Sequence, residues 1–165
     1  MEKDNVIKFK RSQAELSRYI EFSMGSEDYA IPLSMVREVI SLPDTTPIPR
    51  TPAHILGTTD LRGQSVSVID IRKKLKIDAR LGCEEAVIII DIGGINIGVV
   101  VDSINKVFAF TLDEISELPE SKTYLPAQYI VGAFQKTSSL IIILDIAKVL
   151  DLSDHHEIDA WKKSA

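Results

Sequence analysis

Residues whose types commonly carry catalysis are few in this sequence, and none of them forms a complete site. Cys83 and His54 have the chemistry of a nucleophile and a general base, but no third group that would orient the base is evident. Cys83 also follows a glycine in a polar stretch, so a surface or half-buried thiol is the better interpretation. No glycine-rich phosphate loop precedes an expected helix. The sequence therefore predicts a protein that is not an enzyme and takes no cofactor.

The C-terminal segment holds two further features that could serve a site. His155 and His156 lie among acidic residues and could ligate a metal, but no cysteine partner and no ordered scaffold accompany them. We expect a solvated tail and no metal site. Trp161 could anchor a partner or pack back on the domain, and the sequence leaves both possibilities open.

One charged pair remains as a candidate. Glu38 falls in an expected strand and Arg62 at an expected tight turn. Arg62 aligns with Thr137 at the offset of an internal repeat, and Glu38 aligns roughly with Lys106 in a looser pairing of the strands before that repeat. A pair that only one half of the chain carries is a candidate for function. A Glu38–Arg62 ion pair could brace a groove or present charge to a partner. It could equally be a surface salt bridge worth about 0–1 kcal/mol, and both interpretations stay open.

The chain contains an internal repeat. The segment HILGTTDLRGQSVSVIDIRKKL, from His54, aligns without a gap to YIVGAFQKTSSLIIILDIAKVL, 75 residues later. Gly57 matches Gly132, and Asp70 matches Asp145. Features present in both copies are expected to serve the fold: close backbone approach for the glycines and helix capping for the aspartates.

The repeat and the apolar runs together predict an all-β fold. The expected strands span residues 19–24, 29–31, 36–42, 55–61, 65–69, 86–92, 95–101, 104–110, 129–134 and 140–144, with short helices at 71–75 and 146–150. Gly93-Gly94 suits a two-residue hairpin turn. Five short, bent strands per copy favour two small barrels that pack on each other. Nearly continuous apolar strands indicate burial on both faces, between the barrels or beneath a partner.

The composition of the chain limits how its domains can be arranged and which classes of partner it can bind. We expect a mobile arm at 1–17, one domain at 18–150 with halves at about 18–80 and 81–150, and a charged tail at 151–165. The net charge of −5, with only a short basic cluster at Arg72-Lys73-Lys74, predicts no nucleic-acid binding. No apolar run is long enough for a membrane helix, the N-terminus lacks a signal-peptide core, and a single cysteine forms no internal disulfide. A cytoplasmic protein is expected.

Four segments, in order along the chain, resemble the CheW-like domain family. ILGTTDLRGQSVSVIDIRKKL is similar to its signature, in which a glycine is followed by Asn-Leu-Arg-Gly and then Val-Pro-Val-Ile-Asp-Leu-Arg. YIEFSMGSEDYAIPLSMVREVI resembles its opening strands, IGVVVDSINKV its Gly-x-x-Val-Asp-x-Val strand, and YIVGAFQKTSSLIIILDIAKVL its closing strands and helix. The resemblance covers about residues 19–150.

The resemblance implies a fold, a role and partners. It implies two intertwined five-stranded SH3-like barrels in a chemotaxis adaptor that links the cytoplasmic tips of chemoreceptors (methyl-accepting chemotaxis proteins) to the regulatory domain of the histidine kinase CheA. Such an adaptor would be cytoplasmic and recruited to membrane-bound receptor arrays. It also implies two sets of contact residues. The receptor-binding set is Val36, Glu38, Gly57, Arg62, Val99 and Val101, and the kinase-binding set is Ile40 and Leu42.

Two departures and two alternatives accompany this resemblance. Asp60 and Ser67 replace the usual asparagine and proline, and Asp60 could pair with Arg62 in competition with Glu38. One alternative is an adaptor of a parallel chemotaxis-like pathway for twitching or gliding motility. The other is a small-molecule-binding or enzymatic barrel, which would need an enclosed pocket with convergent polar groups.

Overall fold

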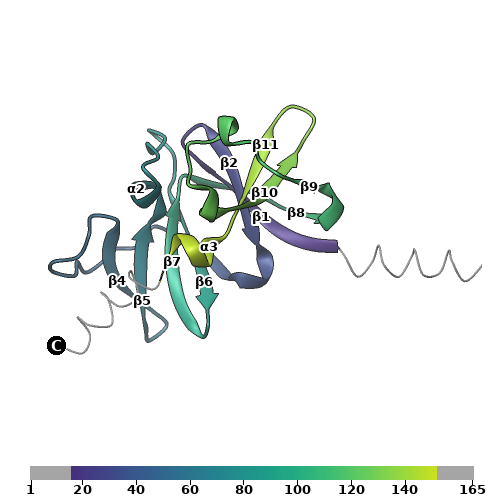
Figure 1. Ribbon diagram of the computed structural model, residues 1–165. Helices are drawn as coiled ribbons and strands as arrows, with labels where there is room; N and C mark the ends of the chain where they lie inside the picture. Colours follow the sequence, from purple (N-terminus) through teal and green to yellow (C-terminus); the bar gives the residue numbers. More distant parts are fainter. Residues whose placement is uncertain (1–15, 152–165) are drawn as a thin grey trace, which may run out of the picture.

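The computed structural model describes residues 16–151, which form two β-sheets side by side with short helices at their junction. Figure 1 shows the strands between residues 55 and 101 on one side, and the strands of residues 16–32 and 103–144 on the other. The all-β fold class is confirmed. No helix among the described residues has the length and apolarity that crossing a membrane requires.

The six-stranded sheet has the order β8-β1-β2-β11-β10-β9. Its strands are β1 (Leu16–Met24), β2 (Glu27–Pro32), β8 (Ser103–Thr111), β9 (Ile115–Ser116), β10 (Ile130–Gln135) and β11 (Leu140–Leu144). All neighbours are antiparallel except β11 and β2, which run parallel. The two-residue β9 is one strand more than the five expected for each barrel.

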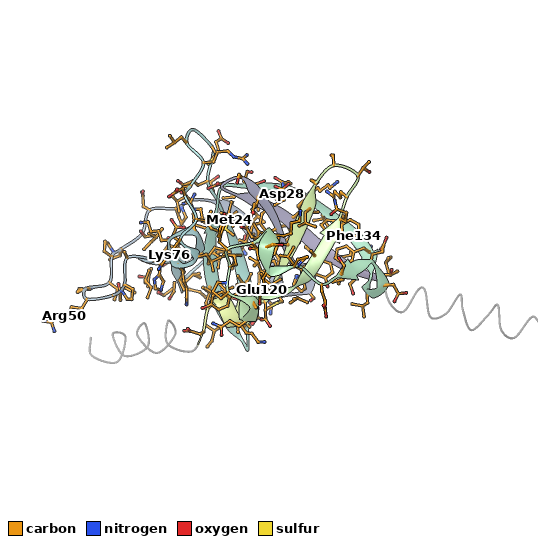
Figure 2. All side chains as sticks on the ribbon, turned by 45° about the horizontal axis from the view of Figure 1, so that its top comes forward. Met24, Asp28, Arg50, Lys76, Glu120 and Phe134 are labelled. Carbon is orange, nitrogen blue, oxygen red and sulfur yellow. The ribbon has the colours of Figure 1, made fainter. Side chains whose placement is uncertain are left out.

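The five-stranded sheet has the order β3-β6-β7-β5-β4. Its strands are β3 (Val36–Ser41), β4 (Ile55–Leu61), β5 (Gln64–Asp70), β6 (Ala86–Ile92) and β7 (Ile95–Val101). Its single parallel pair is β5 with β7. Figure 2 shows Arg50 at the tip of the loop between β3 and β4, pointing away from the rest of the molecule.

Short helices connect the strands. Two α-helices follow β5 and β11: α2 (Ile71–Leu75) and α3 (Ile146–Val149). Four 3-10 helices complete the described elements: η1 (Leu33–Met35), η2 (Leu112–Glu114), η3 (Glu120–Lys122) and η4 (Ala127–Tyr129). Asp70 and Asp145 cap the α-helices as expected, because their carboxylates accept from the amides of Arg72 and Lys148.

The two halves of the chain exchange strands. β1 and β2 belong to the first half of the chain but lie in the sheet of β8–β11, whereas β6 and β7 from the second half lie in the sheet of β3–β5. Each sheet is thus built from both halves, which is the intertwining that the family resemblance implied. The two copies of the repeat nevertheless have the same local structure. A bulge separates Ile55 from Gly57 in the first copy, and a matching bulge separates Ile130 from Gly132 in the second.

The core has three parts. The largest cluster lies between the sheets and includes Phe22, Tyr29, Ile88, Val99 and residues of both α-helices. A second cluster is aliphatic, lies on the other face of the five-stranded sheet, and contains Val66, Val68, Val87, Ile89 and Val100. A third is largely aromatic and belongs to the six-stranded sheet, where Phe110 stacks on both Tyr19 and Phe134. The strands are therefore buried on both faces, and the continuous apolar runs are explained by the fold itself.

Candidate functional site

Arg62 is held outward by a tight turn between β4 and β5. Leu61 pairs with Gln64, so Arg62 and Gly63 form a two-residue loop with φ of 53° and 80°. Positive φ at both positions matches the twist of a hairpin. The carboxylate of Asp60 accepts from the Gly63 amide at 2.8 Å. Asp60 therefore stabilises the turn, and the expected competition between Asp60 and Glu38 for Arg62 is not what the structure shows.

The ion pair between Arg62 and Glu38 is present and joins opposite edges of the five-stranded sheet. Glu38 lies on the edge strand β3, and Arg62 lies beside β4, the other edge strand. The sheet must therefore curl until its edges meet through side chains. The Arg62 side chain is 74% exposed and that of Glu38 26%, so the pair is largely solvated. It contributes little to stability by itself.

A second exposed ion pair lies at the same end of the sheet. Arg37 pairs with Asp91, which also accepts from the amide of Gly94 at 2.8 Å. The Arg37 guanidinium and this amide hold the pKa of Asp91 below its ordinary value. Asp91 thus stabilises the Gly93-Gly94 turn in the way that Asp60 stabilises the Arg62-Gly63 turn, and it also holds Arg37 of β3 at the surface.

An open groove of about 550 Å³ lies between these two pairs. Its lining combines charged, polar and aliphatic side chains: Arg37, Glu38, Leu61, Arg62, Gln64, Val66, Ile89 and Asn96. An aliphatic floor with charged groups around it has the composition of a protein-binding surface. The lining offers no constellation for proton or group transfer.

The six-stranded sheet has its own version of the Arg62–Glu38 contact. Lys136 follows β10, as Arg62 follows β4, and its Nζ lies 2.7 Å from a Glu21 carboxylate oxygen and 5.4 Å from the Phe108 ring centroid. Burial disfavours the charge on Lys136 more than any single neighbour favours it, but the hydrogen bond to Glu21 and the charges of Glu21 and Asp28, with a contact to Lys106, together raise its pKa. The repeat comparison missed this pair because it matched Arg62 with Thr137. The two pairs differ in exposure, since the Glu21 side chain is only 5% exposed.

A buried charge network joins the two sheets and was also missed. Arg72 donates to Asp70, to Asp102 at 2.7 Å and to Glu85, and its side chain is 5% exposed. Asp102 also accepts from the amides of Gly25 and Arg80. Burial disfavours the Asp102 carboxylate, yet these three donors hold its pKa below the ordinary value. No pattern in the sequence distinguishes the buried Arg72 from its exposed neighbour Lys73.

The residues expected at a receptor surface have different surroundings. Glu38 and Arg62 line the groove, and Val36 is half-buried beside the core between the sheets. Gly57 is buried beneath the strand-like segment at Thr46, with which Thr58 forms a bridge. The prediction that Val99 and Val101 contact a receptor must be corrected. Both residues are 0% exposed in the core between the sheets, so neither can touch a partner directly.

The residues expected at a kinase surface lie at the far end of β3. Leu42 is 41% exposed, whereas Ile40 is half-buried against the aliphatic cluster. A bulge between Val36 and Glu38 separates these two environments, because it turns the start of β3 toward the core between the sheets.

The weaker candidates gain no support from their surroundings. Cys83 donates to the carbonyl oxygen of Arg80 at 3.0 Å in the loop after α2. Within residues 16–151, no three histidine, cysteine or acidic side chains gather as a metal site. His155, His156 and Trp161 lie outside the described residues.

Comparison with known proteins gives one consistent result. The model of the CheW-like domain matches residues 18–154. The chain is 31% identical to the chemotaxis protein CheW of Klebsiella aerogenes, over 88% of this chain and 89% of that protein. It is 29% identical to the protein FrzA of Myxococcus xanthus, over 78% of this chain and 82% of FrzA. The crystal structure of the scaffolding protein TtCheW from Thermoanaerobacter tengcongensis superposes with a TM-score of 0.74 at 28% identity, covering 82% of this chain and 92% of that one. The chain therefore belongs to the CheW-like domain family.

Proposed function

We propose that this protein is a non-catalytic adaptor that couples chemoreceptors to the histidine kinase CheA in chemotaxis signalling arrays. The observation that carries the proposal is the family match over residues 18–154, which includes nearly all of the described residues 16–151. Relatives of similar length are named chemotaxis proteins, and a solved relative is named a scaffolding protein. A domain of this kind acts by holding other proteins together at its surfaces.

The groove at Arg62 and Glu38 is the proposed receptor-binding surface. Its aliphatic floor and charged sides suit an amphipathic helical partner such as a receptor tip. Val36 and Gly57 would support this surface from β3 and β4. For the kinase we propose the end of β3 at Leu42, whose exposed side chain offers an apolar contact, with Ile40 beneath it.

Two other functions are possible in principle, and the observations support one of them more than the other. The similarity to FrzA favours, as the second candidate, an adaptor of a parallel motility pathway with its own receptor and kinase. A small-molecule-binding barrel has less support. The aliphatic side chains of Val66, Val68 and Ile89 pack together on the face of the five-stranded sheet that is opposite the core between the sheets, where an enclosed pocket would have to lie.

The proposal is tested by reconstitution. The purified protein is incubated with receptor-containing membranes and CheA, and the pellet and the kinase activity are measured. We expect this protein to bring CheA into the pellet and to raise its autophosphorylation. A protein that stays in the supernatant and leaves the kinase unchanged would exclude the adaptor role. Stimulation of only a motility-pathway kinase would favour the FrzA-like alternative.

Arg62→Ala separates a binding role from a structural one. Because the Arg62 side chain is 74% exposed, its ion pair should contribute at most about 1 kcal/mol, so the melting temperature should barely change. Co-sedimentation with receptors should nevertheless fall. Arg18→Ala is the matched control, since Arg18 is an exposed arginine on β1, outside the groove. A large loss of stability in Arg62→Ala, or equal binding losses in both variants, would show that the groove is not the receptor surface.

A further inference from the structure

A second groove, away from Arg62, is formed where the segment before β10 crosses the end of the six-stranded sheet. We call it the β10 groove. It encloses about 630 Å³. Its apolar side chains are Leu118, Leu125, Ile130 and Val131, and its acidic side chains are Glu117 and Glu120.

The β10 groove combines an exposed apolar surface with acidic side chains. The Val131 side chain is 58% exposed although it lies in a strand, and Leu118, Leu125 and Ile130 pack against the core below. The carboxylates of Glu117 and Glu120 are exposed and form no salt bridge with any residue of the range 16–151. The groove therefore suits an occupant that combines a large apolar side chain with positive charge. Glu120 is labelled in Figure 2.

The described chain ends close to this groove. α3 packs on η4, and Ala127 of η4 lines the groove. Leu150 is buried in the core, and the carboxylate of Asp151 lies 3.8 Å from Nζ of Lys74, at the end of α2. Leu75, next to Lys74, lines a small pocket that shares Thr123 and Leu125 with the β10 groove. The last described residues of the chain therefore lie within a few side chains of the groove.

The sequence after Asp151 contains a matching ligand. Trp161 is the only tryptophan of the chain, and Lys162 and Lys163 follow it directly. Trp161 is ten residues beyond Asp151 (161 − 151), which is about 15 Å as a helix and about 33 Å fully extended. Either distance is enough to reach a groove that starts beside η4.

We propose that the C-terminal segment of this chain docks in the β10 groove, with the Trp161 indole on Leu118, Leu125 and Val131 and with Lys162 and Lys163 beside Glu117 and Glu120. An indole supplies a large apolar area at low entropic cost, and the charge pairs set its orientation. The groove is then covered by the protein's own tail. Any partner that uses this face must displace the tail. The proposal does not depend on the adaptor role.

The single tryptophan makes the test specific. Fluorescence of the full-length protein, excited where tyrosine does not absorb, reports on Trp161 alone. We expect emission at shorter wavelength, and weaker quenching by acrylamide, than for N-acetyltryptophanamide. Val131→Glu should shift the emission to longer wavelength and strengthen the quenching. Val107→Glu is the matched control, because Val107 is 51% exposed on β8 and does not line the groove, so it should change neither value.

Exchanging the charges of the groove and of the tail distinguishes loss of docking from misfolding of a variant. Glu117→Lys with Glu120→Lys should expose Trp161, and adding Lys162→Glu with Lys163→Glu should restore its protection. Three outcomes would overturn the proposal: quenching as strong as that of the model compound, protection that Val131→Glu leaves unchanged, or protection that appears only at concentrations where sedimentation shows a dimer. The last result would assign the groove to a second copy of the chain.

Discussion

Asp102 has no exposed surface, yet its surroundings favour the charged form of its carboxylate. One Arg72 nitrogen and two backbone amides donate to it, and those amides belong to the β1–β2 turn and to the loop after α2. The Arg72 guanidinium lies between Asp70 and Asp102, and these hydrogen bonds raise its pKa above the ordinary value. A few charged atoms therefore tie together a turn of one sheet and a helix and loop of the other.

Removing Asp102 should be far more costly than removing an exposed aspartate. Asp102→Ala leaves the buried Arg72 only partly compensated, and breaking a buried pair in this way costs about 3–5 kcal/mol. Urea unfolding followed by circular dichroism measures the change. Asp44→Ala is the control, because Asp44 is exposed and such surface substitutions stay within about 0.5 kcal/mol.

The same comparison depends on pH in a defined direction. The folded-state pKa of Asp102 is lowered, so its stabilising effect is present above the ordinary carboxyl pKa and is lost as the pH falls through the folded-state value. The difference in unfolding free energy between the wild type and Asp102→Ala should therefore shrink in acid. A difference that stays constant down to strongly acid pH would mean that packing, and not charge, holds this junction.

Sequence reasoning was limited at this scale by what a residue type can reveal. Glu38 and Arg62 were predicted as a pair, and they form one. Arg72 stands in a basic run with Lys73 and Lys74, and burial of only the first of the three depends on contacts with Asp102, 30 residues away. Val99 lies in an apolar strand whose pattern is equally compatible with a partner surface or with a core between two sheets.

At the scale of the elements, the two copies of the repeat show the same structural role for the same residues. Gly57 and Gly132 follow matching bulges, and at both positions a neighbouring chain segment leaves no space for a side chain. A Cβ on Gly57 would lie 2.1 Å from the Thr46 carbonyl oxygen, and one on Gly132 would lie 2.8 Å from that of Ser116. The sequence predicted this role because both copies keep the glycine. The strands, the Gly93-Gly94 turn and the capped helices were predicted equally well from local patterns.

Alanine substitutions should therefore rank in a definite order. Gly57→Ala should be the most damaging, because its Cβ meets backbone and its φ is +137°, and strain of this kind alone costs about 1–3 kcal/mol. Gly132→Ala should cost less, since one of its two closest contacts is the Ile115 side chain, which can shift. Gly82→Ala is the control: its φ is also positive, at +75°, but nothing lies within 4 Å of the added carbon. Melting temperatures measure the order. Equal losses at Gly57 and Gly82 would mean that backbone conformation, and not close approach, requires the glycine.

At the scale of the whole molecule, the repeat and the sheets divide the chain differently. A repeat in sequence shows that two segments have the same local structure, but it does not show which strands pair. Here β1 and β2 complete the sheet of the second copy, and β6 and β7 complete the sheet of the first. Such exchange places four strand pairings between the halves of the chain: β1 with β8, β2 with β11, β3 with β6 and β5 with β7. The positions of the strands could be predicted, and their partners could not, because pairing depends on packing across the entire chain.

This exchange predicts how the molecule should respond to being cut in the loop between α2 and β6. Residues 1–80 alone would hold β3–β5 without the β6 and β7 that join them in the sheet, since β6 links to β3 and β7 links to β5. Residues 81–165 alone would hold β8 and β11 without the β1 and β2 that lie between them. Neither fragment buries an adequate core, so neither should show the dispersed amide signals of a folded protein in an NMR spectrum. Mixed in equal amounts, the two fragments should associate and recover those signals, because each supplies the strands that the other lacks. Carrying Asp102→Ala in the second fragment should weaken this association, since it removes the contact with Arg72 of the first. A first fragment that folds by itself would show instead that each copy of the repeat is an independent unit.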